Sequence, residues 1–248
     1  MTSNKIISTA VILAAGRGTR LKKMGESIPK GFIEVANKPI IEESIERLLS
    51  VGIDEIIIVT GHLSEFYQEL ASKIKSLRII HNDKYAESGS MYSLYILDGI
   101  IKKDFILLES DLVYEIRALT ALINKPVQDC LLVSGFTESN DEVWVHAPNG
   151  KLAGLSKQSK DLLDIHGELV GITKLSLKAF RSMCNIAKQY FETSLHIEYE
   201  TALAETSQHY HIECLKIDDL VWAEIDTEEH LEHVRRKIYP KIHLQEGV

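Results

Sequence analysis

Short apolar runs alternate with amphipathic segments through the first 110 residues, and this rhythm constrains the fold more than any other feature. The runs are rich in Ile, Val and Leu, as expected of strands buried in a sheet. They cover residues 8–13, 55–61, 77–82 and 105–110. Between them, apolar residues recur at helical spacing in residues 39–52, 64–76 and 90–100. This alternation predicts parallel pairing with right-handed crossovers in a doubly wound α/β sheet.

The pattern changes after Asp129, where a hairpin signal replaces the strand–helix rhythm. Residues 142–156 are typical of two strands that turn at Pro148-Asn149-Gly150. Further strands are expected at 130–135, 211–215 and 220–225, and helices at 176–189, 197–206 and 227–237. We therefore expect a mixed sheet in a single domain over residues 1–240, with a first half, 1–128, and a second half, 129–240. Residues 241–248 are expected to form a tail or the start of a linker.

The charge balance and the cysteine content restrict the partners and the compartment. The 28 Lys and Arg residues are outnumbered by 36 Asp and Glu, whereas a surface that binds polynucleotides needs an excess of cations. No apolar run reaches the roughly 20 residues that cross a bilayer, and the start lacks the apolar stretch of a signal peptide. The three cysteines show no CxxC spacing, which favours reduced thiols. We expect a cytoplasmic protein that neither binds nucleic acid polymers nor inserts into membranes.

A loop of small residues follows the first predicted strand, in the sequence LAAGRGTRL at residues 13–21. Small side chains let backbone N–H groups approach phosphate oxygens. The third glycine of GxGxxG is absent, and no GKS or GKT follows, so neither the dinucleotide nor the Walker pattern is complete. A simple tight turn explains the glycines equally well. Two cations, Arg20 and Lys30, lie ten residues apart and could fold onto a triphosphate.

The loop and the segment PKGFIEVANKP, residues 29–39, together resemble the nucleotidyltransferase (NTP transferase) family, over nearly the whole chain. The resemblance implies a Rossmann-like sheet with a nucleotide-binding half, 1–128, and an acceptor-binding half, 129–240. It also implies that Arg20 contacts the β/γ-phosphates and that Lys30 neutralises charge at the reacting phosphate. The loop residues that it places around the nucleotide are Leu13, Ala14, Ala15, Gly16, Gly18 and Thr19.

Two aspartates occupy strand ends where a metal ion could bind. Asp111 ends the run FILLES, and the carboxyl end of such a strand faces the ligand crevice of an open α/β sheet. Asp226 follows the run LVWAEI. Mg²⁺ takes one or two carboxylates together with phosphate oxygens, and both residues match metal positions of the family. Asp226 could instead cap the last helix. Glu109 and Glu224 precede these aspartates by two residues and are expected nearby.

The segment NDKYAESGSMYSLY, residues 82–95, carries the expected nucleotide specificity. Relatives contact the base and ribose from a polar residue and a small Gly/Ser stretch here, which match Asn82 and Ser88, Gly89 and Ser90. The string resembles the cytidylyltransferase branch that activates phosphocholine or 2-aminoethylphosphonate. It implies Mg²⁺-dependent transfer of CMP from CTP to a small amine-bearing phosphonate or phosphate. Phosphocholine, a sugar 1-phosphate, or a regulatory module that binds nucleotide without turnover are the alternatives. A homodimer, or a fusion to another enzyme domain, stays open.

The acceptor headgroup should distinguish these substrates. Aromatic faces hold a quaternary ammonium, whereas a primary ammonium donates hydrogen bonds to carboxylates. Relatives that use phosphocholine place an aromatic residue where this chain has Val143, and Trp144 should face the other side of the strand. This difference favours a primary amine. The acceptor-binding candidates are Tyr92, Glu142, Trp144, Glu198 and Glu200. Core packing for the aromatic residues and solvated helix surfaces for the glutamates remain open.

Overall fold

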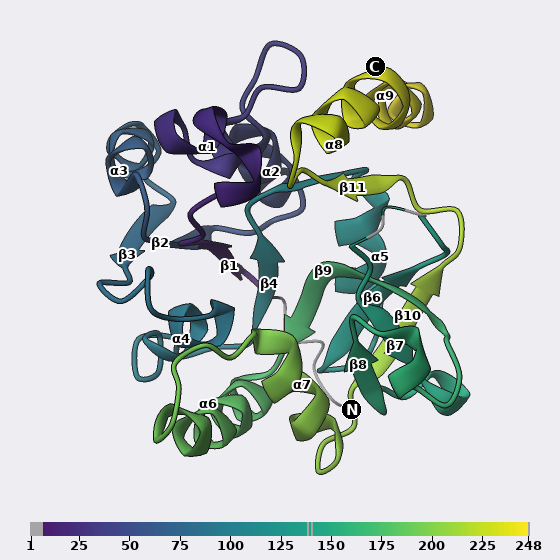
Figure 1. Ribbon diagram of the computed structural model, residues 1–248. Coiled ribbons are helices and arrows are strands. Elements are labelled where there is room, and N and C mark those ends of the chain that lie inside the picture. Colours follow the sequence, from purple (N-terminus) through teal and green to yellow (C-terminus); the bar gives the residue numbers. More distant parts are fainter. Residues whose placement is uncertain (1–6, 138, 140, 248) are drawn as a thin grey trace.

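One sheet runs through both halves of the chain (Figure 1). The computed structural model describes residues 7–137, 139 and 141–247. Its strand order is β10-β6-β9-β4-β1-β2-β3, with β7 and β8 attached beside β9. The strands are β1 (Thr9–Ala14), β2 (Glu55–Thr60), β3 (Leu77–His81), β4 (Phe105–Glu109), β6 (Cys130–Ser134), β7 (Trp144–His146), β8 (Gly154–Ser156), β9 (Gly167–Leu175) and β10 (Glu213–Ile217).

Strands β1 to β4 pair in parallel, and β9 runs antiparallel between β4 and β6. The expected mixed α/β sheet is therefore confirmed. Strand β9 was not expected from the sequence, because its nine residues are all buried and show no alternation of polar and apolar side chains.

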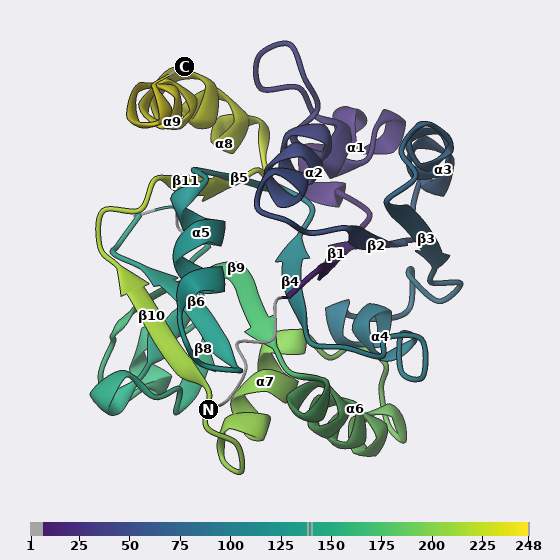
Figure 2. The same cartoon turned by 180° about the vertical axis from the view of Figure 1, so that it is seen from behind.

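Helices cover both faces of the sheet, as Figures 1 and 2 show from opposite sides. Along β1 the side chains alternate: Val11 and Leu13 join one apolar cluster, whereas Ala10 and Ile12 join the other. The first cluster is closed by α4 (Ser90–Tyr95), α6 (Leu177–Phe191) and α7 (Tyr199–Ser207). The second is closed by α2 (Ile40–Ser50), α3 (Ser64–Lys73) and α5 (Arg117–Asn124). The central strands are thus buried on both sides, which fixes their carboxyl ends in place.

A small second sheet and the C-terminal helices pack beside the glycine loop. Strands β5 (Leu112–Tyr114) and β11 (Trp222–Glu224) pair antiparallel. Strand β11 leads into α8 (Glu228–His233), a π-helical turn at Val234–Ile238 and α9 (Tyr239–Glu246), while α1 (Lys23–Ser27) follows the loop. The hydroxyl of Thr227 accepts a 3.1 Å hydrogen bond from the His230 N–H. Thr227, and not Asp226, therefore caps α8.

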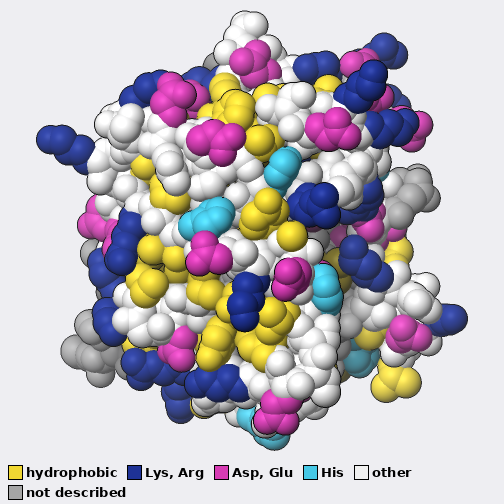
Figure 3. Space-filling model, turned by 60° about the vertical axis from the view of Figure 1, so that its left-hand side comes forward, with side chains coloured by type: hydrophobic (Ala, Val, Ile, Leu, Met, Phe, Trp, Pro, Cys, Tyr) yellow, Lys and Arg dark blue, Asp and Glu magenta, His cyan; other side chains and the backbone are white. Residues whose placement is uncertain are grey.

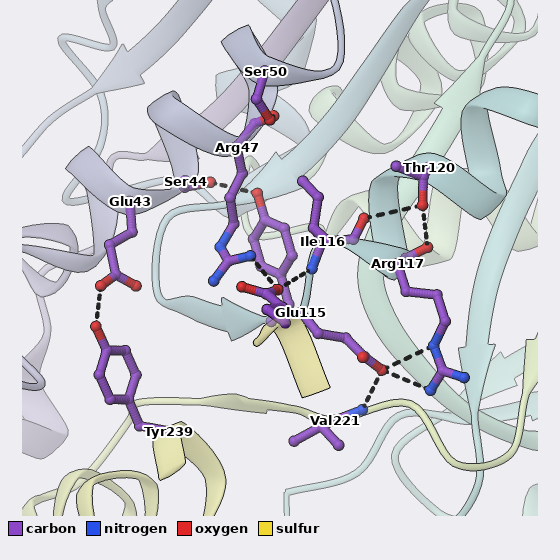
Figure 4. A network of polar contacts seen from close by, with 12 residues as sticks. Glu43, Ser44, Arg47, Ser50, Glu115, Ile116, Arg117, Thr120, Val221 and Tyr239 are labelled. Carbon is purple, nitrogen blue, oxygen red and sulfur yellow. Dashed lines mark hydrogen bonds and ion pairs between the residues drawn. The ribbon is translucent and has the colours of Figure 1, made fainter. Parts of the chain in front are cut away.

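Residues 241–246 form part of α9, in contrast to the expected tail. Ile242 is fully buried in a cluster that also contains Leu231 and Val234. The Glu246 carboxylate accepts hydrogen bonds from Arg47 at 2.5 Å and from the Ile116 N–H at 2.6 Å. Arg47 and Ile116 face the same space in Figure 4, from α2 and from the residue before α5. Contacts far apart in the sequence thus order this segment, and its local polarity gave no sign of them.

The surface of the described residues is mixed in charge. On the face drawn in Figure 3, Lys and Arg side chains are interspersed with Asp and Glu. No helix within residues 7–137, 139 and 141–247 is long and apolar enough to cross a bilayer.

Candidate functional site

The glycine loop leaves β1 at the carboxyl edge of the sheet and is tightly packed. Gly18 has φ 61°, in the left-handed region that glycine adopts readily. A Cβ on Gly25 would lie 2.2 Å from the Gly18 carbonyl oxygen, so the start of α1 packs directly on the loop backbone. The Ser110 N–H donates to the Leu13 carbonyl at 3.1 Å, which ties the end of β1 to the end of β4. These contacts fix the loop at the edge of the sheet where Asp111 also emerges.

A cavity of about 280 Å³ opens at this edge and is bounded by the loop on one side and by α4 on the other. Seven of the ten predicted nucleotide-binding residues line it: Leu13, Ala14, Ala15, Gly16, Ser88, Gly89 and Ser90. Asn82 lies behind the wall, where its amide nitrogen donates to Ser88 Oγ at 3.1 Å and Ser93 Oγ at 3.0 Å. Asn82 thus orders the wall of the cavity. Gly18 and Thr19 lie further along the loop, outside the lining.

The second half of the chain closes this cavity at Gly89. A Cβ at Gly89 would lie 2.3 Å from the Ile197 carbonyl oxygen, and the Gly89 N–H donates to the Leu195 carbonyl at 2.9 Å. Glu198 accepts from both the N–H and the hydroxyl of Ser90, at 3.0 and 2.5 Å. The structure therefore places Glu198, expected at the acceptor, in the cavity that the glycine loop bounds.

Two cations and three carboxylates form one connected group beside the cavity. Lys30 donates to Asp111 Oδ2 at 2.7 Å and also contacts Asp226 Oδ1. Arg20 reaches the same Asp226 oxygen at 2.9 Å and forms a second ion pair with Asp141. Burial alone would lower the pKa of Lys30, but Asp111 and Asp226 outweigh it and raise the pKa above its ordinary value. Lys30 is therefore fully charged at neutral pH.

Asp111 and Asp226 have the donor chemistry of a magnesium site. Asp226 is 3% exposed and Asp111 is 12% exposed, and the Lys30 ammonium lies between their carboxylates. Their oxygens thus already hold a cation, and two carboxylates suffice for Mg²⁺ when phosphate oxygens complete its shell. Within the described part of the chain, no group of three or more His, Cys, Asp or Glu side chains is placed to hold a metal ion. Phosphate oxygens and waters could complete the shell of an ion held by the two aspartates.

A cluster of acidic side chains lies behind the aspartates. Tyr199 donates its hydroxyl to Glu109 Oε1 at 2.7 Å. Burial, together with the charges of Glu224 and Glu200, raises the pKa of Glu109 well above its ordinary value. Burial followed by Asp111 likewise raises the pKa of Glu224, to about 8. Glu200 Oε2 is buried and has no hydrogen-bond partner among the residues that the structure describes. A cation that binds beside Glu109 and Glu224 would therefore stabilise their ionised forms.

The aromatic candidates for the acceptor are engaged elsewhere. Tyr92 packs on Phe191 with a ring separation of 5.3 Å, and Trp144 packs on Phe136 at 5.6 Å. Glu142 lines a second cavity, of about 640 Å³, together with Asp141 and Glu224. Asp141 and Tyr199 lie in the two stretches, 141–144 and 198–200, that the sequence offers for the acceptor, but neither was among the acceptor-binding candidates. The one available signal was their position beside acidic residues in a polar stretch of the second half.

The comparisons with known proteins agree with this geometry. A family model, the MobA-like NTP transferase domain, matches residues 10–151, which is more than half of the 248-residue chain. Over 98 residues the chain is 43% identical to the choline-phosphate cytidylyltransferase of Streptococcus pneumoniae, an alignment that covers 40% of this chain and 42% of that relative. Over 161 residues it is 27% identical to the 2-aminoethylphosphonate cytidylyltransferase of Lancefieldella rimae, covering 64% and 65%. Both alignments span less than two thirds of the relative's own length.

A solved structure shares the fold over nearly the whole chain. The inositol-1-phosphate CTP transferase from T. maritima matches with a TM-score of 0.82 at 17% identity, covering 96% of this chain and 97% of that one. The sheet order, the glycine loop and the family model all indicate the same family. The chain therefore belongs to the MobA-like NTP transferase family and is a nucleotidyltransferase by class.

Proposed function

We propose that the protein is a Mg²⁺-dependent cytidylyltransferase that transfers CMP from CTP to 2-aminoethylphosphonate. A phosphonate oxygen attacks the α-phosphorus of CTP, and a new P–O bond forms. The bond between the α-phosphorus and the α/β-bridging oxygen breaks, and pyrophosphate leaves with its electron pair. The attacking oxygen is already an anion at neutral pH, so this step needs no covalent enzyme intermediate.

The residues of the connected group would position the substrates and offset their charge. Lys30 lies at the edge of the 280 Å³ cavity, where it can neutralise the reacting phosphate, and Arg20 can reach the β- and γ-phosphates. Asp111 and Asp226 would hold Mg²⁺, which when bound relieves repulsion between the phosphates and aligns them. The small residues of the loop and of Ser88–Ser90 would enclose the nucleotide. Both halves of the chain would then act as one catalytic unit.

The acidic cluster is the observation that supports an acceptor with a primary amine. Glu109 lines the 280 Å³ cavity and Glu224 the 640 Å³ cavity. A primary ammonium beside either one would donate hydrogen bonds to its carboxyl group and favour the ionised form, which burial otherwise opposes. A quaternary ammonium would need aromatic faces. Trp144 and Tyr92 pack against other rings, although Phe136 and Trp222 line the 640 Å³ cavity. The Lancefieldella rimae relative supports a primary amine. Phosphocholine is the second candidate, and the 43% identity to the Streptococcus pneumoniae relative favours it.

A panel of substrates tests the proposal. Pyrophosphate release is measured with CTP, UTP, ATP and GTP, each against 2-aminoethylphosphonate, phosphocholine and glucose 1-phosphate, with Mg²⁺ and with a chelator. We expect the highest kcat/KM for CTP with 2-aminoethylphosphonate and no release in the chelator. Preference for phosphocholine would replace the acceptor, and preference for another NTP would refute the cytidylyl assignment.

A further inference from the structure

A line of six alternating charges connects the two cavities. It runs from Lys157 through Asp141, Arg20, Asp226 and Lys30 to Asp111. Asp141 lines the 640 Å³ cavity, together with Glu142 and Glu224. Lys30 and Asp111 line the 280 Å³ cavity at the other end. Arg20 is the link between the ends, because its guanidinium contacts Asp141 with one nitrogen and Asp226 with the other.

In the proposed function Arg20 contacts the β- and γ-phosphates, so a triphosphate bound in the loop would draw Arg20 away from this position. Its side chain is 52% exposed, so it is free to turn, whereas Asp226 is 3% exposed and fixed. When the Arg20 guanidinium turns to the phosphates, its ion pair with Asp141 is broken. Within the described residues, Asp141 would keep its side-chain contacts with Asp226 and with Lys157. The ion pair with Lys157, at 3.3 Å and with the lysine 62% exposed, is too weak to neutralise Asp141 fully. Asp141 is only 22% exposed, so its charge then acts on the cavity that Glu142 and Glu224 also line.

We infer that Asp141 is an exchange residue: it holds Arg20 while the nucleotide is absent and accepts the acceptor's ammonium once the nucleotide has taken Arg20. This inference rests on the proposed function, since it assigns the amine to this cavity. It makes the two substrates bind cooperatively, with the nucleotide first. Each substrate binds more tightly in the presence of the other, because nucleotide binding already separates Arg20 from Asp141.

Binding measurements without turnover test this exchange. Calorimetry is run with 2-aminoethylphosphonate alone and in the presence of Mg²⁺ and the α,β-methylene analogue of CTP, which cannot release pyrophosphate. In the unmodified protein the analogue should tighten acceptor binding at least about tenfold, the value of one charged hydrogen bond. In Asp141→Asn this gain should fall below about twofold. The analogue itself should bind Asp141→Asn about two- to fivefold more tightly, because Arg20 is no longer held.

Two further variants complete the design. Arg20→Ala breaks the same ion pair from the other side, so acceptor binding should no longer depend on the analogue. Asp164→Asn removes an exposed carboxylate elsewhere in the acceptor half and should behave as the unmodified protein. An undiminished gain in Asp141→Asn, or a persisting dependence in Arg20→Ala, would overturn the inference.

The exchange can be separated from the choice of substrates. If the unmodified protein binds neither the CTP analogue nor the amine, the proposed function fails. Inorganic tripolyphosphate then serves as the probe, since it needs Arg20 but neither base nor acceptor. Tighter binding of tripolyphosphate to Asp141→Asn than to Asp164→Asn would still support the holding of Arg20 by Asp141, and equal binding would refute it.

Discussion

Replacing Glu246 by alanine should release the C-terminal helix from the body of the protein. The Glu246 carboxylate accepts hydrogen bonds from Arg47 at 2.5 Å and from the Ile116 N–H at 2.6 Å. Both charged side chains are mostly buried, with 17% of Arg47 and 16% of Glu246 exposed. The alanine variant would leave a guanidinium and a backbone N–H without their acceptor. α9 would then be held mainly by Ile242 and by the hydrogen bond from Tyr239 to Glu43.

The size of the effect follows from these contacts. A hydrogen bond to a charged group contributes about 1.5–3 kcal/mol, and some of this is regained when water reaches Arg47. We expect the free energy of unfolding to fall by about 2 kcal/mol, which for a chain of this length lowers Tm by about 4–8 °C. Glu232→Ala is the matched control, because Glu232 is 54% exposed and pairs with Arg235 and Arg236 on the surface. Its loss should cost less than about 1 kcal/mol.

Differential scanning calorimetry at several pH values measures both variants. Burial would raise the pKa of Glu246, but Arg47 and the Ile116 N–H outweigh it and hold the pKa below its ordinary 4.5. A lowered pKa in the folded state stabilises the protein above the unfolded pKa, and this stability is lost as the pH falls through the folded pKa. The Tm difference between the unmodified protein and Glu246→Ala should thus be full at pH 7 and shrink below pH 4.5. Equal Tm values for Glu246→Ala and Glu232→Ala at pH 7 would refute the anchoring role.

Three other substitutions test the site. Lys30→Ala should lower kcat by about 10²–10³ in a pyrophosphate-release assay, because one donor to the reacting phosphate is lost; Lys73→Ala, which breaks an exposed pair with Glu69, should leave kcat unchanged. Gly89→Ala should raise the KM for the nucleotide at least tenfold, because the new Cβ would lie 2.3 Å from the Ile197 carbonyl oxygen. Gly99→Ala is the folding control. Its Cβ would meet nothing within 4 Å, and its φ of +83° carries only a local backbone cost. Tyr199→Phe removes the hydroxyl that Glu109 accepts at 2.7 Å and should lower the free energy of unfolding by about 1–3 kcal/mol in urea titrations, whereas an unchanged midpoint would show that the buried carboxyl group finds another donor.

The sheet of the first half could be predicted because its strands are short runs dominated by Ile, Val and Leu, even though β3 contains Arg78, but β9 could not. Its sequence, GELVGITKL, contains two glycines, a threonine and a lysine, yet every residue is buried. Lys174 is accommodated because its ammonium donates to the carbonyls of Leu122 and Lys125, at 2.9 and 2.7 Å. Gly171 adopts φ 77° between β4 and β6. Only the packed neighbours make this segment a central strand.

The site, like the sheet, could be predicted only in part from the sequence. The motif singled out Arg20 and Lys30, and the strand ends singled out Asp111 and Asp226; ion pairs join all four into one group in the structure. The spacing could not tell that Glu198 and Tyr199, although adjacent, contact different parts of the site. Glu198 turns to Ser90 at the start of α4, whereas Tyr199 reaches Glu109 at the end of β4. Such directions depend on where α7 begins relative to the sheet, which single-sequence patterns do not fix.

The antiparallel strand β9 also governs how the chain reaches its folded state. β4 pairs with β1 on one edge and with β9 on the other, and four of its five side chains are completely buried. During synthesis the second edge of β4 stays unpaired until residues 167–175 have emerged, and an open apolar edge is where nascent chains associate. The family model ends at residue 151, before this strand. A fragment cut at that boundary would keep the whole glycine loop and still be prone to aggregate.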